Sequence, residues 1–254
     1  MARAFPRQFS ALLGPRARAV LDGAAPAGAL RDREFVALPG ALDAAAARRG
    51  LAALEAGLRP LLRRVDAPIP AWTIAGQTRS FQERLPKVGR FWTATLERRG
   101  TRAWRAAEAC GLVAMLRSES CRAFAAALAG RPLAPRPGVQ VLCYAEGDYL
   151  GPHTDHHPDI AAARDGYLDL HVTLATRGVA RQLLIRSEAG HFAAPVDIAA
   201  SGTITAHRLP FWHQVTPLEA RAGRAGEARR WILLASFRFA RPQSATAVTG
   251  GDSR

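Results

Sequence analysis

The sequence predicts an α+β fold in which a block of helices precedes an antiparallel β sandwich or barrel. Leucines recur at near-helical intervals in the first half of the chain, whereas the second half contains many short runs of branched and aromatic residues between Gly, Pro or charged turns. The length of 254 residues suits one domain, because β-rich barrels and sandwiches often reach this size undivided. Apolar residues make up 48% of the chain, which is enough for a sizeable core.

The chain opens with a segment of little periodicity. Residues 1–32 alternate Arg, Ala, Pro and Gly, and we interpret them as an irregular lead-in. Their basic composition is superficially that of a transit peptide, but the whole chain shares this bias and the segment lacks the long apolar stretch of a secretory signal. Residues 34–40 are expected to form a short strand that a Pro-Gly turn closes.

Three helical patterns follow. Leucines at near-helical spacing predict a helix over residues 41–64. A second pattern covers residues 102–116, and a third begins at Ser118 or Ser120, which are suitable N-caps, and ends at Gly130. We expect these helices to pack against a sheet.

The segment between the first two helices has a different character. Residues 65–93 contain several Pro and Gly residues that interrupt any long element. Trp72, Gln77 and Arg79 lie there and could line a substrate pocket, because functional residues concentrate in loops on a rigid scaffold. A surface excursion anchored by its tryptophans is the alternative.

The second half turns to β composition after a Pro-rich stretch. Strands are expected at residues 139–144, 168–174, 181–185, 202–206, 214–216 and 231–237. We assign residues 33–240 to a single domain, with helical support over 41–130 and a β core over 138–238. Residues 241–254 are polar and are interpreted as a flexible tail.

Charge and cysteine usage narrow the classes of partner. The net charge of +14 is compatible with a nucleic-acid partner, but the arginines are spread along the whole chain, so we do not expect one. An anionic small-molecule substrate accounts for the charge equally well. The three cysteines are an odd number without a metal-binding or redox spacing, which indicates reduced thiols in a cytoplasmic protein. No apolar run approaches the length of a membrane span.

All seven histidines lie between residues 153 and 213, which indicates a site in the β half. Two His-x-Asp pairs occur there, and residues two apart on an extended chain lie on one face, so either pair could chelate a metal. The proline inside His157-Pro-Asp159 suits a loop better than a sheet, and we prefer His153-Thr-Asp155. With His213, this pair gives two imidazoles and one carboxylate, the ligand set of an open-faced non-haem iron site.

The surroundings of these residues carry a resemblance to a known family. Residues 144–155, Tyr-x-x-Gly-Asp-x-Leu-x-x-His-x-Asp, resemble the first metal motif of the Fe(II)/2-oxoglutarate-dependent oxygenases, in particular their prolyl-hydroxylase-like branch. Gly202-Thr-Ile and His213-x-Val-x-Pro are similar to that family's glycine-led strand and distal-histidine motif. Residues 230–237 resemble the strand that follows, which opens with arginine and ends with an aromatic residue.

The resemblance implies a double-stranded β-helix core, the jelly-roll of the cupins, with the N-terminal helices packed on one face. It implies that His153, Asp155 and His213 bind Fe(II) and leave three positions for 2-oxoglutarate and O2. Arg230 is implied to bind the far carboxylate of 2-oxoglutarate, because a guanidinium offers a bidentate, always-charged partner.

Other residues of the cosubstrate site stay open at this stage. Arg229 competes with Arg230, because one step along a strand moves every side chain to the other face. The interval between His213 and Arg230 is longer than this branch usually has, which makes Arg224 a fallback. Tyr144 is expected to bond 2-oxoglutarate, and Thr173 or His171 could supply a further polar contact. Gln182 falls where relatives have Gly-Gly near the pocket mouth, so we expect it to contact substrate.

The function these observations favour is a 2-oxoglutarate-dependent dioxygenase that hydroxylates an unactivated C–H bond of a small or amino-acid-like molecule and releases succinate and CO2. A nucleic-acid dealkylase of the same superfamily is one alternative, although Gly226 and Ala228 stand where the Asn and Thr of its arginine motif are expected. A cupin-like metal-binding module without redox turnover is the other. The sequence does not distinguish hydroxylation from desaturation or cyclisation, and it leaves the substrate and the oligomeric state open.

Overall fold

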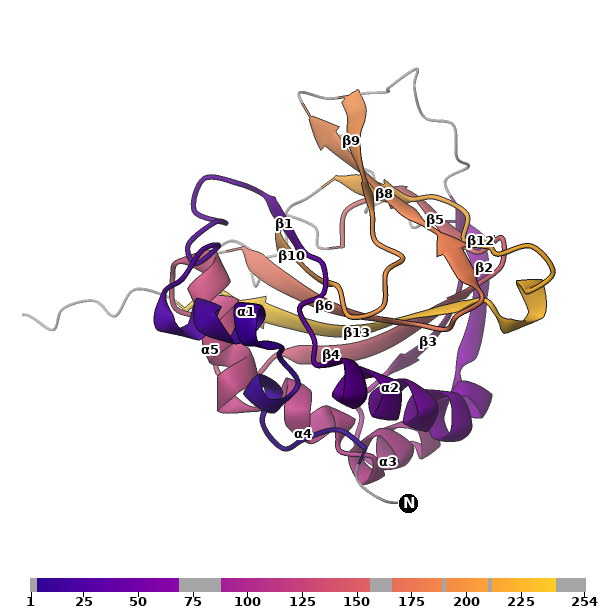
Figure 1. The fold of residues 1–254 in the computed structure, drawn as a ribbon, viewed down its shortest axis with the longest axis horizontal. Coiled ribbons are helices and arrows are strands. Elements are labelled where there is room, and N and C mark those ends of the chain that lie inside the picture. The colour runs from indigo at the N-terminus through magenta and orange to yellow at the C-terminus, as the bar shows by residue number, and fades with distance from the viewer. Residues whose placement is uncertain (1–3, 69–87, 156–165, 189–190, 210–211, 241–254) are drawn as a thin grey trace, which may run out of the picture.

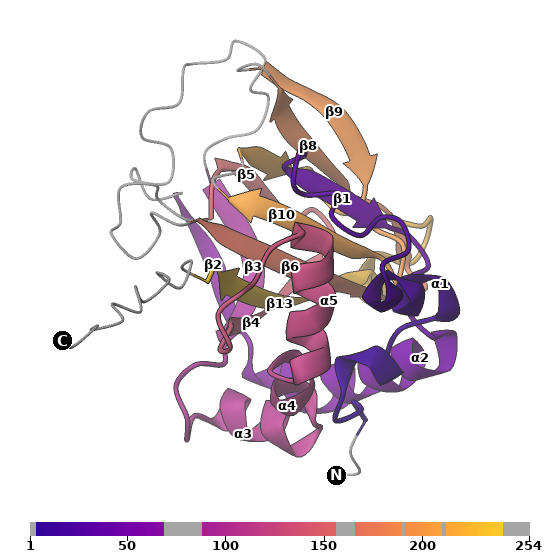
Figure 2. The same cartoon turned by 90° about the vertical axis from the view of Figure 1, so that its left-hand side faces the viewer.

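The computed structural model describes residues 4–68, 88–155, 166–188, 191–209 and 212–240. Its main element is an antiparallel sheet of eleven strands, which curls so that β5, β11, β8 and β9 lie across from β6, β13 and β4 (Figure 1). Helices cover the outer face of the sheet, on the side away from β8 and β9 (Figures 1 and 2). The fold is therefore α+β with a jelly-roll core, as the sequence predicts.

The strands of the sheet occur in the order β1-β10-β6-β13-β4-β3-β5-β11-β8-β9, with β2 paired to β3 outside this path. Their bounds are β1 Phe35–Leu38, β2 Arg63–Pro68, β3 Val88–Thr95, β4 Gly138–Ala145, β5 Tyr149–His153, β6 Tyr167–Ala175, β8 Leu183–Glu188, β9 His191–Asp197, β10 Ile204–Leu209, β11 His213–Val215 and β13 Arg229–Arg238. Two short strands, β7 Val179–Arg181 and β12 Glu219–Ala220, pair separately.

Alternation along the strands separates two layers of the core. On β13, Trp231 and Leu233 point to the helices, whereas Arg230 and Ile232 point into the curl of the sheet. Tyr144 on β4 is the direct partner of Arg230 across the ladder and therefore shares its inward face. The inner face is where polar side chains are buried, and it forms the site described below.

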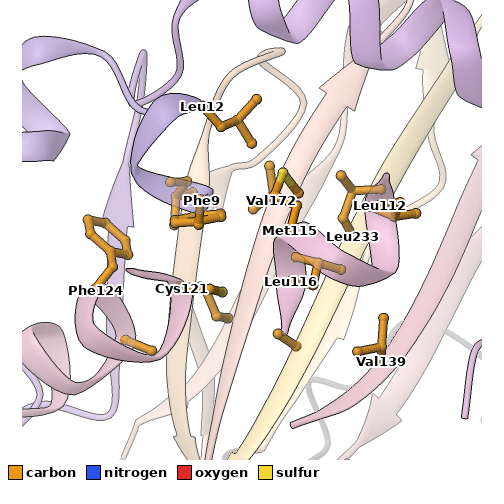
Figure 3. Close-up of a cluster of buried hydrophobic side chains, with 14 of the residues drawn as sticks. Phe9, Leu12, Leu112, Met115, Leu116, Cys121, Phe124, Val139, Val172 and Leu233 are labelled. Carbon is orange, nitrogen blue, oxygen red and sulfur yellow. The ribbon is translucent and has the colours of Figure 1, made fainter. Parts of the chain in front are cut away.

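The outer layer packs against the helices α2 Ala44–Ala53, α3 Arg102–Ala109, α4 Leu112–Leu116 and α5 Glu119–Ala129. Side-chain oxygens of Asp43, Thr101 and Ser118 cap α2, α3 and α5 by accepting backbone N–H groups, which explains where these helices begin. Figure 3 shows α4 and α5 side chains meeting the strand residues Val139, Val172 and Leu233. No helix of the described residues is long and apolar enough to cross a membrane.

The N-terminal segment differs from the irregular lead-in that we expect from the sequence. It contains the 3-10 helices η1 Phe9–Ala11 and η2 Ala19–Asp22 and the short helix α1 Pro15–Arg18. Phe9 is fully buried, and its ring centroid lies 5.5 Å from that of Phe124 on α5 (Figure 3). The sparse apolar residues of this segment thus complete the core, a tertiary effect that local periodicity does not reveal.

The helix predicted over residues 41–64 is longer than the helix observed, because α2 ends at Ala53. After α2 the chain continues as a π-helical turn over Leu54–Leu58 and a 3-10 turn over Arg59–Leu61, where Pro60 limits further α-helix. Residues 63–68 then form strand β2. Strands β3, β5 and β9 lie where no strand is expected. The predicted pocket residues Trp72, Gln77 and Arg79 lie outside the described residues. The assignment of one domain stays a prediction.

Candidate metal centre

Two imidazoles and a carboxylate meet at the end of the inner face. His153 ends β5 and pairs directly with His213 at the start of β11, so the antiparallel ladder places the two rings side by side with centroids 4.2 Å apart. Asp155 follows two residues after β5, and its carboxylate oxygens lie 3.4 Å from His153 Nε2 and 3.8 Å from His213 Nε2. One ligand atom from each of the three residues lies within 4.8 Å of the others.

The orientation of His153 suits a metal ligand. Its Nδ1 lies 2.8 Å from the carbonyl oxygen of Gly151, so Nδ1 carries the proton and Nε2 presents a lone pair toward Asp155. His153 Nε2 and Asp155 Oδ2 are buried and have no hydrogen-bond partner among the described residues. Buried polar atoms are normally satisfied, and a divalent cation between these atoms would satisfy both.

Electrostatics keep the carboxylate available. Burial opposes ionisation of Asp155, but the neighbouring His153 and His213 outweigh it and hold the pKa of this carboxyl well below its usual range. Asp155 is therefore a carboxylate at neutral pH. Two imidazole nitrogens and one carboxylate form the 2-His-1-carboxylate set that divalent non-haem iron favours.

A buried arginine faces the same cavity. Arg230 is 1% exposed, and its Nε and Nη1 donate to Ile198 O at 2.9 Å and to Gln182 Oε1 at 3.0 Å. Its Nη2 lies 3.3 Å from the Thr173 hydroxyl oxygen. Burial lowers the pKa of Arg230 to about 10, so the guanidinium remains charged at neutral pH. Among the described residues it makes no ion pair, and its hydrogen-bond acceptors are neutral.

The cavity between the metal ligands and Arg230 is small, with a volume of about 60 Å³. Tyr144 forms one wall, and its ring centroid lies 5.8 Å from the guanidinium carbon of Arg230. The other lining residues are Gln140, Leu142, Leu150, His171, Leu184, Ile198, Thr205, Val215, Ile232 and Leu234, with His153, Asp155 and His213 at the metal end. The site is thus a largely apolar compartment with a candidate metal-binding end and one buried cation.

The other two candidate arginines have different partners. Arg229 points to the outer face, where its Nε lies 2.8 Å and 3.0 Å from the two carboxylate oxygens of Glu55. Arg224 is exposed and pairs with Glu227 at 2.8 Å. Of the three arginines, the structure places Arg230 alone in the lining of the cavity.

Thr173 and Gln182, two of the polar residues predicted for the site, both contact Arg230. Thr173 is fully buried beside Arg230 and does not line the cavity, so it contacts the guanidinium. Gln182 is also fully buried behind Arg230, with its amide bonded to Arg230 and to two backbone carbonyl oxygens. Gln182 lines neither the cavity nor the open groove, and its expected contact with substrate stays a prediction.

An open groove of about 540 Å³ adjoins the metal end of the cavity. It shares Gln140, Leu150, His153 and Asp155 with the cavity and extends along the inner side of β2 and β3. Sequence reasoning missed Gln140, although strand alternation from Tyr144 places residues 142 and 140 on the same face. Its Nε2 donates to Thr93 Oγ1 at 2.9 Å, and Thr93 donates to Val141 O, so Gln140 Oε1 is the remaining acceptor of this amide.

No protein-family model matches the chain, and no curated protein matches its sequence. Solved structures do match. The non-haem α-ketoglutarate-dependent epimerase SnoN from nogalamycin biosynthesis is 20% identical with a TM-score of 0.54, over 92% of this chain and 90% of SnoN. AviO1 from Streptomyces viridochromogenes Tue57 is 16% identical with a TM-score of 0.52, over 87% of this chain and 97% of AviO1.

SnoN has also been solved in complex with Fe3+, α-ketoglutarate and nogalamycin RO, and that structure matches with 19% identity and a TM-score of 0.52. At these identities the likeness establishes the fold. The chain therefore shares the fold of the α-ketoglutarate-dependent epimerase SnoN. Its assignment to the Fe(II)/2-oxoglutarate oxygenases, which the sequence motifs predict, is part of the function proposed below, and the narrower assignment to their prolyl-hydroxylase-like branch stays a prediction.

Proposed function

We propose that this protein is an Fe(II)/2-oxoglutarate-dependent dioxygenase that oxidises a C–H bond of a small molecule. The observation that carries the proposal is the buried Arg230, a charged group that forms no ion pair among the described residues, in the lining of the same small cavity as a His-Asp-His cluster. Removing a charge from water is costly unless it is paired, so an anionic ligand is the expected occupant of this end of the cavity.

His153, Asp155 and His213 are the residues that would hold Fe(II). Hydrogen bonding of His153 Nδ1 to Gly151 fixes the ring so that Nε2 faces the metal position. Iron with 2-oxoglutarate and O2 would supply the oxidation of a substrate C–H bond to an alcohol, with release of succinate and CO2. The protein contributes the three ligands, the fixed guanidinium and the exclusion of water by Leu142, Leu150 and the other apolar walls.

At the other end, Arg230 would bind the far carboxylate of 2-oxoglutarate. Three of its N–H groups contact Ile198, Gln182 and Thr173, which leaves two of the five guanidinium donors for a ligand. Tyr144 lines the cavity beside Arg230, and burial raises the pKa of its phenol, so it is a neutral O–H donor. The cavity therefore has a cation at one end and candidate metal ligands at the other, which are the groups that a 2-oxo dicarboxylate would bind.

The adjoining groove is the proposed substrate side. It reaches His153 and Asp155 and carries both apolar walls, such as Val65 and Phe91, and polar groups, such as Gln140 and Arg63. We propose that the reaction is hydroxylation of a small or amino-acid-like substrate. We also propose a cytoplasmic location, with which the protein's buried free cysteines agree. A metal-binding module without redox turnover would have no use for the buried guanidinium.

The test begins with binding. Purified protein is loaded with Fe(II) without oxygen and titrated with 2-oxoglutarate. We expect a visible metal-to-ligand charge-transfer band whose absorbance rises with added 2-oxoglutarate and saturates at a stoichiometric amount of bound ligand. Admission of O2 with a panel of small substrates should then release succinate, and the mass change of the product separates hydroxylation from desaturation, cyclisation or epimerisation. Absence of both the band and succinate release would refute the proposed function.

A further inference from the structure

Gln182 lies in the break between β7 and β8 and is fully buried. Its Nε2 donates to the carbonyl oxygens of Thr216 at 3.0 Å and Asp148 at 3.3 Å. Its Oε1 accepts from Arg230 Nη1 at 3.0 Å. One amide therefore connects the turn after β4, the segment after β11 and the guanidinium on β13.

These contacts fix which way the amide points. Two backbone carbonyl oxygens surround one end of the side chain, and only an NH2 group can satisfy them. The amide oxygen must then face Arg230. Because a glutamine oxygen carries only a partial charge, it holds the guanidinium without neutralising it, as do Ile198 O and Thr173 Oγ1.

Two arginines that lie near this part of the sheet pair with carboxylates instead. Arg229, one residue away, is held by Glu55 at 2.8 Å, and Arg64 is held by Asp148 at 2.7 Å. An arginine with such an internal partner has little attraction left for an anionic ligand. Arg230 is restrained by neutral acceptors alone among the described residues, so its position is fixed while its charge remains available.

We propose that Gln182 is a positioning residue that orients Arg230 and keeps its charge free, and that it thereby makes the site selective for a 2-oxo dicarboxylate over a 2-oxo monocarboxylate. This inference rests on the proposed function. Gln182→Glu places a carboxylate beside the guanidinium and cancels the attraction for the far carboxylate of the ligand. Gln182→Met removes the hydrogen bonds at similar size without adding a charge, and serves as the matched control.

The experiment compares two ligands on the Fe(II)-loaded protein without oxygen. 2-Oxoglutarate and 2-oxopentanoate share the 2-oxo acid group and the chain length, but 2-oxopentanoate lacks the far carboxylate. Titrations of the charge-transfer band give both dissociation constants for the wild type, Gln182→Glu and Gln182→Met. The preference of each protein is the ratio of its two constants, and this ratio is insensitive to a general loss of active protein.

We expect Gln182→Glu to raise the dissociation constant of 2-oxoglutarate by about 10- to 150-fold, the range for losing a hydrogen bond to a charged group. The dissociation constant of 2-oxopentanoate should stay within about threefold of the wild-type value. Gln182→Met should weaken 2-oxoglutarate less, because the guanidinium loses a restraint but keeps its charge. A preference unchanged in Gln182→Glu, or an equal loss in the two variants, overturns the inference.

Other outcomes are also decisive. If Gln182→Glu does not fold, Gln182→Met must still lower the preference for 2-oxoglutarate; an unchanged preference in that variant refutes the positioning role. If the wild type itself binds neither ligand, the proposed function fails first. Normal 2-oxoglutarate binding by the wild type with unaltered preference in both variants refutes the role of Gln182 alone.

Discussion

Replacement of Arg230 by methionine tests the cavity most directly, because it removes the buried charge and keeps much of the side-chain volume. Arg230 uses three N–H donors on Ile198, Gln182 and Thr173, so two remain for a ligand carboxylate. Each hydrogen bond to a charged group contributes about 1.5–3 kcal/mol. Their loss amounts to about 3–6 kcal/mol, or a weakening of 2-oxoglutarate binding by about 10²- to 10⁴-fold.

A thermal-shift assay without oxygen makes this measurable. A ligand at 100 times its dissociation constant stabilises the folded state by about 2.7 kcal/mol. For a chain of this size, 1 kcal/mol corresponds to about 2–4 °C in Tm, so 2-oxoglutarate should raise the Tm of the Fe(II)-loaded wild type by about 5–11 °C. In Arg230→Met the dissociation constant exceeds the ligand concentration, and the shift should vanish.

Arg229→Met is the matched control. It removes an arginine from the adjacent position of the same strand, where the side chain points to the outer face and pairs with Glu55. This variant should have a lower Tm than the wild type, because Glu55 loses its ion pair with Arg229 and keeps Trp231 Nε1 as a donor, but the shift caused by 2-oxoglutarate should be unchanged. A full ligand shift in Arg230→Met, or its loss in Arg229→Met instead, would refute the assignment of the cation.

Three further predictions follow from the structure. Asp155→Ala should abolish stoichiometric Fe(II) binding, measured by metal analysis after gel filtration, while the circular dichroism spectrum is retained; full iron content in the variant would exclude this ligand. Phe9→Ala should lower the free energy of unfolding by about 3–5 kcal/mol in denaturant titration, since Phe9 is fully buried against Phe124, and a loss below 1 kcal/mol would contradict its place in the core. Burial raises the pKa of Cys143 to about 12, so at pH 8 the thiol should resist iodoacetamide in the folded protein and react after unfolding; rapid labelling of Cys143 in the native state would contradict the buried position.

The parts of the fold that the sequence predicts are those with strong local signals. β4 and β13 consist of branched and apolar runs and are found within one or two residues of the expected limits. β5, Tyr149–His153, contains Gly and Pro, and local propensity gives no reason to expect a strand there. It forms because β3 and β11 pair with it, which is a tertiary effect.

The candidate site shows the same division. His153, Asp155 and His213 are found from their spacing and surroundings, and the structure brings them together. The choice between Arg229 and Arg230 needs the register of β13, because neighbours on a strand face opposite sides of the sheet. Two consecutive arginines in the sequence do not show which of them faces inward. Gln182 shows the limit most clearly, since its role depends on two backbone carbonyls from distant segments.

Both ends of the proposed cosubstrate cavity are held by paired strands, and this arrangement would restrict the length of a ligand that reaches both ends. His153 and His213 are fixed as partners across the β5–β11 ladder, and Arg230 is fixed beside Tyr144 across the β13–β4 ladder. Because the ladders set both positions, the distance between the metal end and the guanidinium changes little, and the volume of about 60 Å³ between them accepts only a small ligand. A longer or shorter dicarboxylate would satisfy one anchor at the expense of the other. The open groove shares Gln140, Leu150, His153 and Asp155 with the cavity, whereas Arg230 and Tyr144 do not line it. Substitutions in the rest of the groove would therefore leave the proposed cosubstrate end of the cavity unchanged.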